Sequence, residues 1–365
     1  MSDSCQSSAP FATRPFPDGN RREFLKYSVG AAGILSASTL SAAEKPSTVR
    51  RIKVGFLGTN HSHFAAKYEL LKTSPDYEVV GCSEEDPAVR AGGPTGVKWL
   101  SAEDVINASE VVVIEGLVRN HFRDARRSLK AGRHVHVEKP PATSVGELKE
   151  LLELAAHQRR LLQVGYMWRQ HPGLNAVLTA AREGWLGEIY LVRAMINTQG
   201  DSVRRKEWSE FRGGILFELG CHLIDPVIRL LGAPDQVQAT LRQTGDPGDT
   251  LMDNAAVTFS YPKTVAVVTC SAVQRGAGLY RSFEVFGTQG VARLQPVEPP
   301  GLIMDLVQAA GPYVQGRQEI PQPAFRRYEG EFAALAECLR SGRSLAVSPA
   351  EELAVQSALI KACRM

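Results

Sequence analysis

Residues 132–141 read Gly-Arg-His-Val-His-Val-Glu-Lys-Pro-Pro, and this stretch decides the fold. The alternation over residues 134–137 predicts a short strand. The two prolines end it, because proline lacks a backbone donor and does not continue a central strand. Lys139 therefore lies just beyond the carboxyl end of a strand, where open α/β sheets bind their ligands. A lysine there can hold or transfer a proton, so we predict that Lys139 is the chemical centre.

The segments before this stretch alternate between strand and helix patterns. Buried strands are predicted by apolar runs at residues 52–58, 77–82 and 111–114. Residues 64–72 and 121–131 have helical spacing. This alternation predicts a parallel, doubly wound sheet. We place a Rossmann-type nucleotide-binding domain at residues 51–166.

The pattern changes from residue 167 onward. Alternating segments typical of an antiparallel sheet occur at residues 254–261, 264–271, 282–286 and 291–294. Helices are predicted at residues 213–231, 326–340 and 349–363. We therefore predict a second, α+β domain for substrate binding and oligomerisation at residues 167–365.

The amino-terminal segment differs from the rest of the chain. It carries Arg21-Arg22, a weakly apolar run at residues 27–40 and the small residues Ser41-Ala42-Ala43. This resembles a twin-arginine export signal, and the run is too short and too poor in large apolar residues to span a membrane. We predict a signal peptide at residues 1–43, a linker at 44–50 and export to the periplasm. An N-terminal anchor or a disordered tail is the alternative.

Composition sets the broad class. The chain has 365 residues, 44% apolar and 22% charged, with a net charge of +3. The basic residues are scattered, so we predict a globular protein that does not bind nucleic acid. Its six cysteines form no CxxC pair and no zinc spacing, and we expect buried free thiols.

Two pairs of histidines suggest a possible metal-binding site. His61 and His63 flank one residue, and His134 and His136 project to one face of a strand. Metal sites need three or four convergent ligands, and the spacing shows no such set. We therefore predict no metal.

The turn after the first strand is an altered nucleotide-binding loop. A Rossmann fingerprint has three glycines, and only the first of them, Gly58, is present here. Asn60 is a tolerable substitute, because Asn adopts positive φ more easily than other residues. His63 is bulkier and either pushes the helix outward or points toward the ligand. We assign Gly58, Thr59, Asn60 and His63 to cofactor binding.

An acidic turn follows the second strand. Ser83 and Glu84 stand near the position of the fingerprint's acidic residue. A carboxylate there would hold the ribose hydroxyls and repel a 2′-phosphate. This favours NAD, although Arg90 keeps NADP open. The alternative is a surface turn with solvated acids.

Residues 213–225 form the second informative stretch. On a helix Glu218 and His222 are four residues apart and share a face. Asp225, three residues further on, could orient the imidazole. Such a set makes an acid/base pair. The alternative is an amphipathic helix whose polar face meets solvent.

These segments together resemble the Gfo/Idh/MocA family, the group of glucose–fructose oxidoreductase and inositol dehydrogenase. The resemblance is carried by residues 54–58, 120–121, 131–140, 163–172, 213–225 and 286–290. It implies that Lys139 and His222 are the catalytic lysine and histidine. The family's other catalytic carboxylate, usually aspartate, falls on Glu218, which is longer by one methylene.

The resemblance also implies a Rossmann domain with bound NAD(P) and a second domain with an open antiparallel sheet that serves as an oligomer interface. It implies sugar or polyol substrates. From the matching segments we assign cofactor contacts to His121, Glu138 and Lys139. Substrate contacts are assigned to Lys139, Arg169, Glu218 and His222. Trp208 is added to them because it lies in the segment 199–212, where Trp and charged donors suit sugar faces and hydroxyls.

The leading hypothesis is hydride transfer between a sugar carbinol carbon and nicotinamide. His222 would take the hydroxyl proton, and Lys139 would stabilise the developing alkoxide. Glu218 and Asp225 would orient these groups. One alternative uses the same residues for transient oxidation, elimination of a glycosidic substituent and reduction. The other alternative is a sugar-binding protein that has lost its cofactor.

Overall fold

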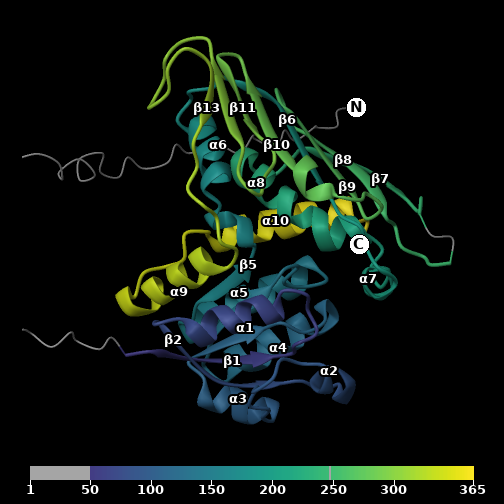
Figure 1. Ribbon diagram of the computed structural model, residues 1–365, viewed down its shortest axis with the longest axis vertical. Helices are drawn as coiled ribbons and strands as arrows, with labels where there is room; N and C mark the ends of the chain where they lie inside the picture. The colour runs from purple at the N-terminus through teal and green to yellow at the C-terminus, as the bar shows by residue number, and fades with distance from the viewer. Residues whose placement is uncertain (1–49, 246–247) are drawn as a thin grey trace, which may run out of the picture. The chain divides into compact units, whose positions relative to one another are not determined.

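The computed structural model describes residues 50–245 and 248–365. The predicted signal peptide and nearly all of the predicted linker lie outside the described residues. Within the described part, two sheets organise the chain (Figure 1). No helix there is long and apolar enough to cross a membrane.

The first sheet has five parallel strands in the order β2-β1-β3-β4-β5. They are β1 (Ile52–Leu57), β2 (Tyr77–Ser83), β3 (Val111–Ile114), β4 (His134–Glu138) and β5 (Leu162–Gly165). The helices between them are α1 (Phe64–Thr73), α2 (Pro87–Ala91), α3 (Ala102–Ala108), α4 (Val118–Lys130) and α5 (Val145–Gln158). The predicted parallel, Rossmann-type sheet is thereby confirmed.

The second sheet has eight strands in the order β13-β12-β11-β10-β6-β9-β8-β7. They are β6 (Ile189–Asn197), β7 (Gln236–Arg242), β8 (Asn254–Ser260), β9 (Val265–Ser271), β10 (Ser282–Gly287), β11 (Gly290–Leu294), β12 (Leu302–Leu306) and β13 (Gly316–Ile320). All neighbours are antiparallel except β6 and β9. The prediction of a mainly antiparallel sheet is confirmed.

Helices pack on one face of this sheet. The helical segments of this part are η1 (Met167–Gln170), α6 (Pro172–Arg182), α7 (Ser202–Trp208), η2 (Leu216–Gly220), α8 (Cys221–Leu231), η3 (Ala277–Tyr280), α9 (Glu329–Ser341) and α10 (Pro349–Ala362). Contacts of α6, α8 and α10 with the strands cover one face (Figure 1). Along β8, buried and more exposed residues alternate, as expected for a sheet with one open face.

The predicted single helix over residues 213–231 is two helical segments. Residues Leu216–Gly220 form a π-helical turn, and α8 begins at Cys221. Such turns are rare and occur often at functional sites. The wider turn changes the offset between Glu218 and His222, which the sequence analysis took as one face of an α-helix.

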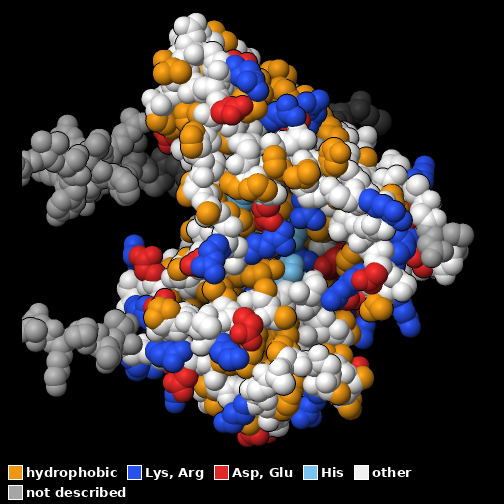
Figure 2. Space-filling view, viewed as in Figure 1, with side chains coloured by type: hydrophobic (Ala, Val, Ile, Leu, Met, Phe, Trp, Pro, Cys, Tyr) orange, Lys and Arg blue, Asp and Glu red, His pale blue; other side chains and the backbone are white. Residues whose placement is uncertain are grey.

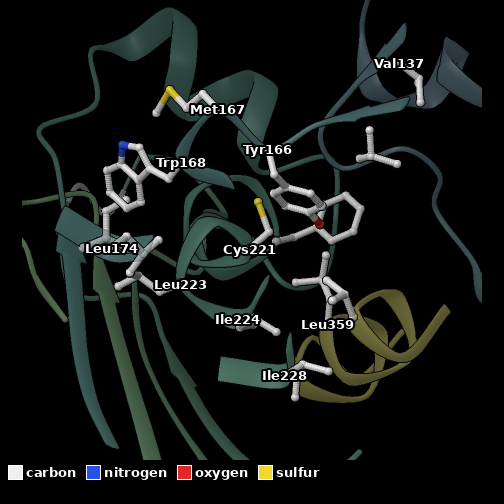
Figure 3. Packing of buried hydrophobic residues seen from close by; sticks show 14 of the residues in the cluster. Val137, Tyr166, Met167, Trp168, Leu174, Cys221, Leu223, Ile224, Ile228 and Leu359 are labelled. Atoms are coloured by element: carbon white, nitrogen blue, oxygen red, sulfur yellow. The ribbon is translucent and has the colours of Figure 1, made fainter. Parts of the chain in front are cut away.

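Apolar side chains join the two sheets. Figure 3 shows side chains of η1, α8 and α10 in one cluster, among them Trp168, Ile224, Ile228 and Leu359. Tyr166 and Cys221 belong to the same cluster and are buried. The five described cysteines are free thiols, four of them buried, as expected.

Candidate active site

The turn after β1 meets the turn after β3. Gly58 has φ +74°, and a Cβ atom there would lie 2.3 Å from the Cα atom of Gly116. Only glycine allows this approach. The first position of the fingerprint therefore keeps its steric role, although the other two positions are not glycine.

A cavity at the carboxyl edge of the first sheet collects several predicted cofactor residues. Gly58, Asn60, Ser83 and Glu84 line it. The Glu84 carboxylate Oε2 accepts hydrogen bonds from the backbone N–H of Thr59 (2.7 Å) and from its hydroxyl (3.1 Å). The acidic turn is therefore fixed to the glycine loop and is not simply a solvated surface turn.

The same cavity has lining residues that the sequence analysis missed. They are Glu85, Asp86, Gly116, Leu117, Arg119, Asn120, Arg123, Asp124 and Arg127. For residues 116–127 the available signal is the start of α4 directly after β3, because helix starts at this edge of a parallel sheet bind nucleotide phosphates.

His121 has a different role from the predicted one. It is fully buried, with Nδ1 2.8 Å from the carbonyl oxygen of Pro140 and Nε2 3.1 Å from that of Gly116. The ring therefore packs between the loops after β3 and β4, and its single N–H can donate to one of the two carbonyls. The predicted cofactor contact is corrected to this positioning role.

Lys139 lies just after β4, as predicted, and is 1% exposed. Its Nζ atom donates to the Glu218 carboxylate Oε1 (2.5 Å) and to the Glu218 backbone oxygen (3.0 Å). Burial alone would lower the pKa of Lys139, but the Glu218 charge outweighs it and raises the pKa. Lys139 is therefore a fixed cation. Burial would raise the pKa of Glu218, yet Lys139 holds it at about 2.

His222 faces a pocket of aromatic rings. Its ring centroid lies 5.5 Å from Trp168, 6.2 Å from Tyr166 and 6.3 Å from His63. Burial, followed by the charge of Lys139, lowers the pKa of His222 well below its ordinary value. Its Nδ1 atom has no hydrogen-bond partner among the described residues. A neutral imidazole with a free nitrogen can accept a proton.

Asp225 and Arg169 are ion-paired, which corrects two predictions. Arg169 contacts Asp225 Oδ1 at 2.7 Å and Glu352 Oε1 at 2.5 Å, and Arg229 lies 3.5 Å from Asp225 Oδ2. The Asp225 carboxylate therefore does not hydrogen-bond His222. The Arg169 guanidinium is occupied by carboxylates rather than open to a substrate, and it ties η1 to α8 and α10. Glu352 is too distant in sequence for the pairing to be foreseen.

Trp208 ends α7 and is partly buried. A Cβ atom on Gly200 would lie 2.6 Å from its ring, so the indole packs on that glycine. Its predicted contact with substrate stays a prediction.

A second charged cluster, centred on Lys67, was missed. Lys67 is fully buried, and its Nζ atom lies 2.7 Å from Glu115, 2.5 Å from Glu138 and 3.8 Å from Glu331. His136 Nε2 lies 3.0 Å from the same atom. Burial raises the pKa of Glu115 to about 8 and that of Glu331 to about 7. The available signal was one lysine within the apolar face of α1.

The two histidines of the altered glycine loop point into the space between these clusters. His63 Nδ1 lies 3.2 Å from Glu138 Oε1, and His61 Nε2 lies 3.5 Å from Glu218 Oε1. Burial lowers the pKa of His61 to about 3 and also lowers that of His63, so both imidazoles are neutral. Of the two outcomes predicted for His63, the inward orientation is the one observed. Figure 2 shows histidine side chains within a hollow bordered by charged residues.

Comparison with known proteins agrees with this arrangement. Residues 52–166 match the oxidoreductase family with an NAD-binding Rossmann fold, and residues 175–293 match the GFO/IDH/MocA C-terminal domain. An uncharacterized oxidoreductase of Schizosaccharomyces pombe is 31% identical over 259 residues, covering 66% of this chain and 69% of the relative. The chain belongs to the Gfo/Idh/MocA family. It is an NAD(P)-dependent oxidoreductase.

Two proteins of named activity or pathway are also similar to this chain. The scyllo-inositol 2-dehydrogenase (NADP(+)) IolW of Bacillus subtilis is 28% identical over 229 residues, covering 60% of this chain and 63% of the relative. The solved structure of GenD2 from gentamicin A biosynthesis, in complex with NAD, has a TM-score of 0.72 at 22% identity. It covers 91% of this chain and 97% of GenD2. At that identity the likeness shows the shared fold alone.

Proposed function

We propose that this protein transfers a hydride between nicotinamide and a carbon bearing a hydroxyl group in a sugar, polyol or related compound. The observation that carries the proposal is that a cationic Lys139, just after β4, contacts Glu218 in the π-helical turn that leads directly into the neutral His222. A dehydrogenase needs one group to accept the hydroxyl proton and another to stabilise the oxygen as its charge develops. These two residues supply both.

The residues at the sheet edge fit a dinucleotide. Gly58, Asn60, Ser83 and Glu84 line a cavity there, and the close approach of Gly58 to Gly116 leaves no space for a side chain at the turn. When bound, the cofactor supplies the hydride acceptor. In this proposal His222 takes the hydroxyl proton, Lys139 hydrogen-bonds the same oxygen, and Glu218 orients the Lys139 ammonium.

The substrate class is supported by the polar lining of the site and by the polyol named for the Bacillus subtilis relative. The direct test supplies NAD⁺ or NADP⁺ with a panel of polyols and sugars and follows nicotinamide absorbance. Reduction of the nicotinamide by at least one CH–OH substrate is the expected result. A glycoside split without a net change in absorbance would favour the transient-oxidation alternative. Purified protein that holds and binds no nucleotide would overturn the proposal.

We further propose a preference for NAD over NADP, supported by the fixed position of Glu84. Glu84→Gln keeps an oxygen for the Thr59 N–H but removes the charge that opposes a 2′-phosphate. The ratio of kcat/KM for NADP to that for NAD should rise about tenfold or more, because a hydrogen bond to a charged group contributes about 1.5–3 kcal/mol.

The matched control for this cofactor prediction is Glu78→Gln, an exposed position on strand β2, which ends one residue before Glu84. It should leave the ratio of the two kcat/KM values unchanged. An unchanged ratio in Glu84→Gln as well would show that Glu84 does not select the cofactor.

Two expectations from the sequence remain proposals. Export through a twin-arginine signal rests on residues 1–43. Self-association through the open face of the eight-stranded sheet is supported by charged and aromatic side chains there, including Arg193, Glu284 and Tyr190. Arg193 lies 3.1 Å from Glu284 across neighbouring strands.

A further inference from the structure

Three potential metal ligands converge beside the catalytic cluster. His61 and His63 come from the loop between β1 and α1, and Glu138 ends β4. One ligand atom from each lies within 4.8 Å of the others. The spacing of the histidines in the sequence shows no convergent set of ligands, but the fold brings one together from segments about 75 residues apart.

The atoms that face one another in this set lack hydrogen-bond partners. His63 Nδ1, His61 Nε2 and Glu138 Oε1 are buried and unpaired within the described part of the chain. His63 Nδ1 and Glu138 Oε1 lie 3.2 Å apart without forming a hydrogen bond. Two ligands about 2.0–2.2 Å from one tetrahedral ion are separated by about 3.3 Å. The spacing is therefore that of two donors to a shared ion.

The residues around this set provide what a metal site needs beyond its ligands. Glu138 Oε2 accepts from Lys67 at 2.5 Å, which fixes the carboxylate and leaves Oε1 free. The backbone N–H of His63 donates to His61 Nδ1 at 3.2 Å, which fixes the His61 ring, and His61 Nε2 lies 3.5 Å from Glu218 Oε1.

The balance of buried charge also favours a cation. Four carboxylates, those of Glu115, Glu138, Glu218 and Glu331, surround two ammonium groups, Lys67 and Lys139. The fully ionised cluster has two negative charges in excess. A divalent cation would compensate both, whereas without one the cluster must take up protons.

We propose that His61, His63 and Glu138 form a binding site for a divalent transition-metal ion, with zinc as the first candidate. Two imidazoles and a carboxylate are a ligand set of catalytic zinc sites, which keep a fourth position open. The ring centroid of His63 lies 6.3 Å from that of His222, and Glu138 Oε1 lies 4.0 Å from Lys139 Nζ. An ion here would thus border the catalytic residues.

The test measures metal content and does not depend on the proposed function. Full-length protein is stripped with a chelator, and ZnCl₂ or CoCl₂ is added back. Bound metal is quantified after gel filtration, and the cobalt form is examined for the visible absorption of a tetrahedral site. We expect one ion per chain. Removing one ligand by His63→Ala should weaken Zn²⁺ binding roughly 100-fold or more, since even supporting residues change affinity 10–100-fold.

The control is His157→Ala, which removes an exposed histidine on α5 and should leave metal binding unchanged. Glu138 also pairs with Lys67, so Glu138→Gln can unfold the protein. His63→Ala is the safer variant, because the His63 side chain is 14% exposed and its buried ring nitrogen makes no hydrogen bond. Stripped wild type that binds nucleotide but no zinc or cobalt would overturn the metal site and leave the proposed function standing. Equal zinc binding by wild type, His61→Ala and His63→Ala would also overturn it.

Discussion

Replacing Lys139 with alanine is expected to cut turnover by about 10²–10⁴-fold while the protein still folds and binds nucleotide. Lys139 is buried and held as a cation by Glu218, so its ammonium can stabilise an oxygen that gains charge during reaction. Because its pKa is raised, Lys139 does not release its proton at neutral pH. Its role is electrostatic, and proton acceptance falls to His222.

The measurement is kcat with the best substrate of the panel, alongside nucleotide affinity and thermal unfolding. Lys149→Ala, an exposed lysine on α5, is the control and should keep full activity. Lys139→Ala with near-normal kcat would remove the lysine from the chemistry. Lys139→Ala could also lose activity by unfolding, because it leaves the Glu218 carboxylate without a partner. The double variant Lys139→Ala, Glu218→Gln removes that charge, so it should fold and should still be inactive.

Replacing Lys67 with methionine is expected to lower the free energy of unfolding by about 3–5 kcal/mol, because removing one partner leaves buried charges uncompensated. Three carboxylates converge on Lys67 and no other lysine or arginine of the described chain ion-pairs with them, apart from the 4.0 Å approach of Lys139 to Glu138. Denaturant unfolding measures the change. Lys72→Met on the same helix is the control, because Lys72 is exposed and its pair with Glu69 contributes little.

The loss in Lys67→Met should depend on pH. Burial raises the folded-state pKa of Glu115 to about 8 and of Glu331 to about 7, from 4.5. A carboxyl group whose pKa is raised by folding lowers stability as pH rises from its unfolded to its folded pKa. Removing Lys67 raises the pKa values of Glu115 and Glu331 further. The loss of unfolding free energy should therefore be greatest above about pH 8 and should shrink toward pH 5. An equal loss at pH 5 and above pH 8 would contradict this account.

The sequence predicted most of the fold because its signals are local. β-branched runs such as residues 111–114 become fully buried strands, and alternation over residues 254–261 becomes β8. The strands β6, β7, β12 and β13 were not predicted. Two of them are edge strands with many exposed positions, so their hydrophobic pattern is weak. The π-turn at Leu216–Gly220 has no signal in helical periodicity.

Site residues could be predicted where the pattern within one short segment was enough to indicate their role. Lys139 after a strand and His222 in an apolar helix were predicted that way, and the structure brings Glu218 onto Lys139. Ion pairs between segments that lie far apart in the sequence could not be predicted. Asp225 was matched with His222, three residues away, because its true partner Arg169 lies 56 residues earlier. The Lys67 cluster was missed for the same reason.

The pairing of Arg169 with Glu352 also bears on how the protein is made. Glu352 and Gln356 belong to α10, and the Gln356 side chain donates to the backbone oxygen of Ala142, close after Lys139. A chain still being synthesised, with residues 349–363 inside the ribosome, would leave Arg169 without one of its two carboxylates and the loop after Lys139 without its anchor. The contacts that tie Arg169 and the loop after Lys139 to α10 therefore form only after this helix has left the ribosome.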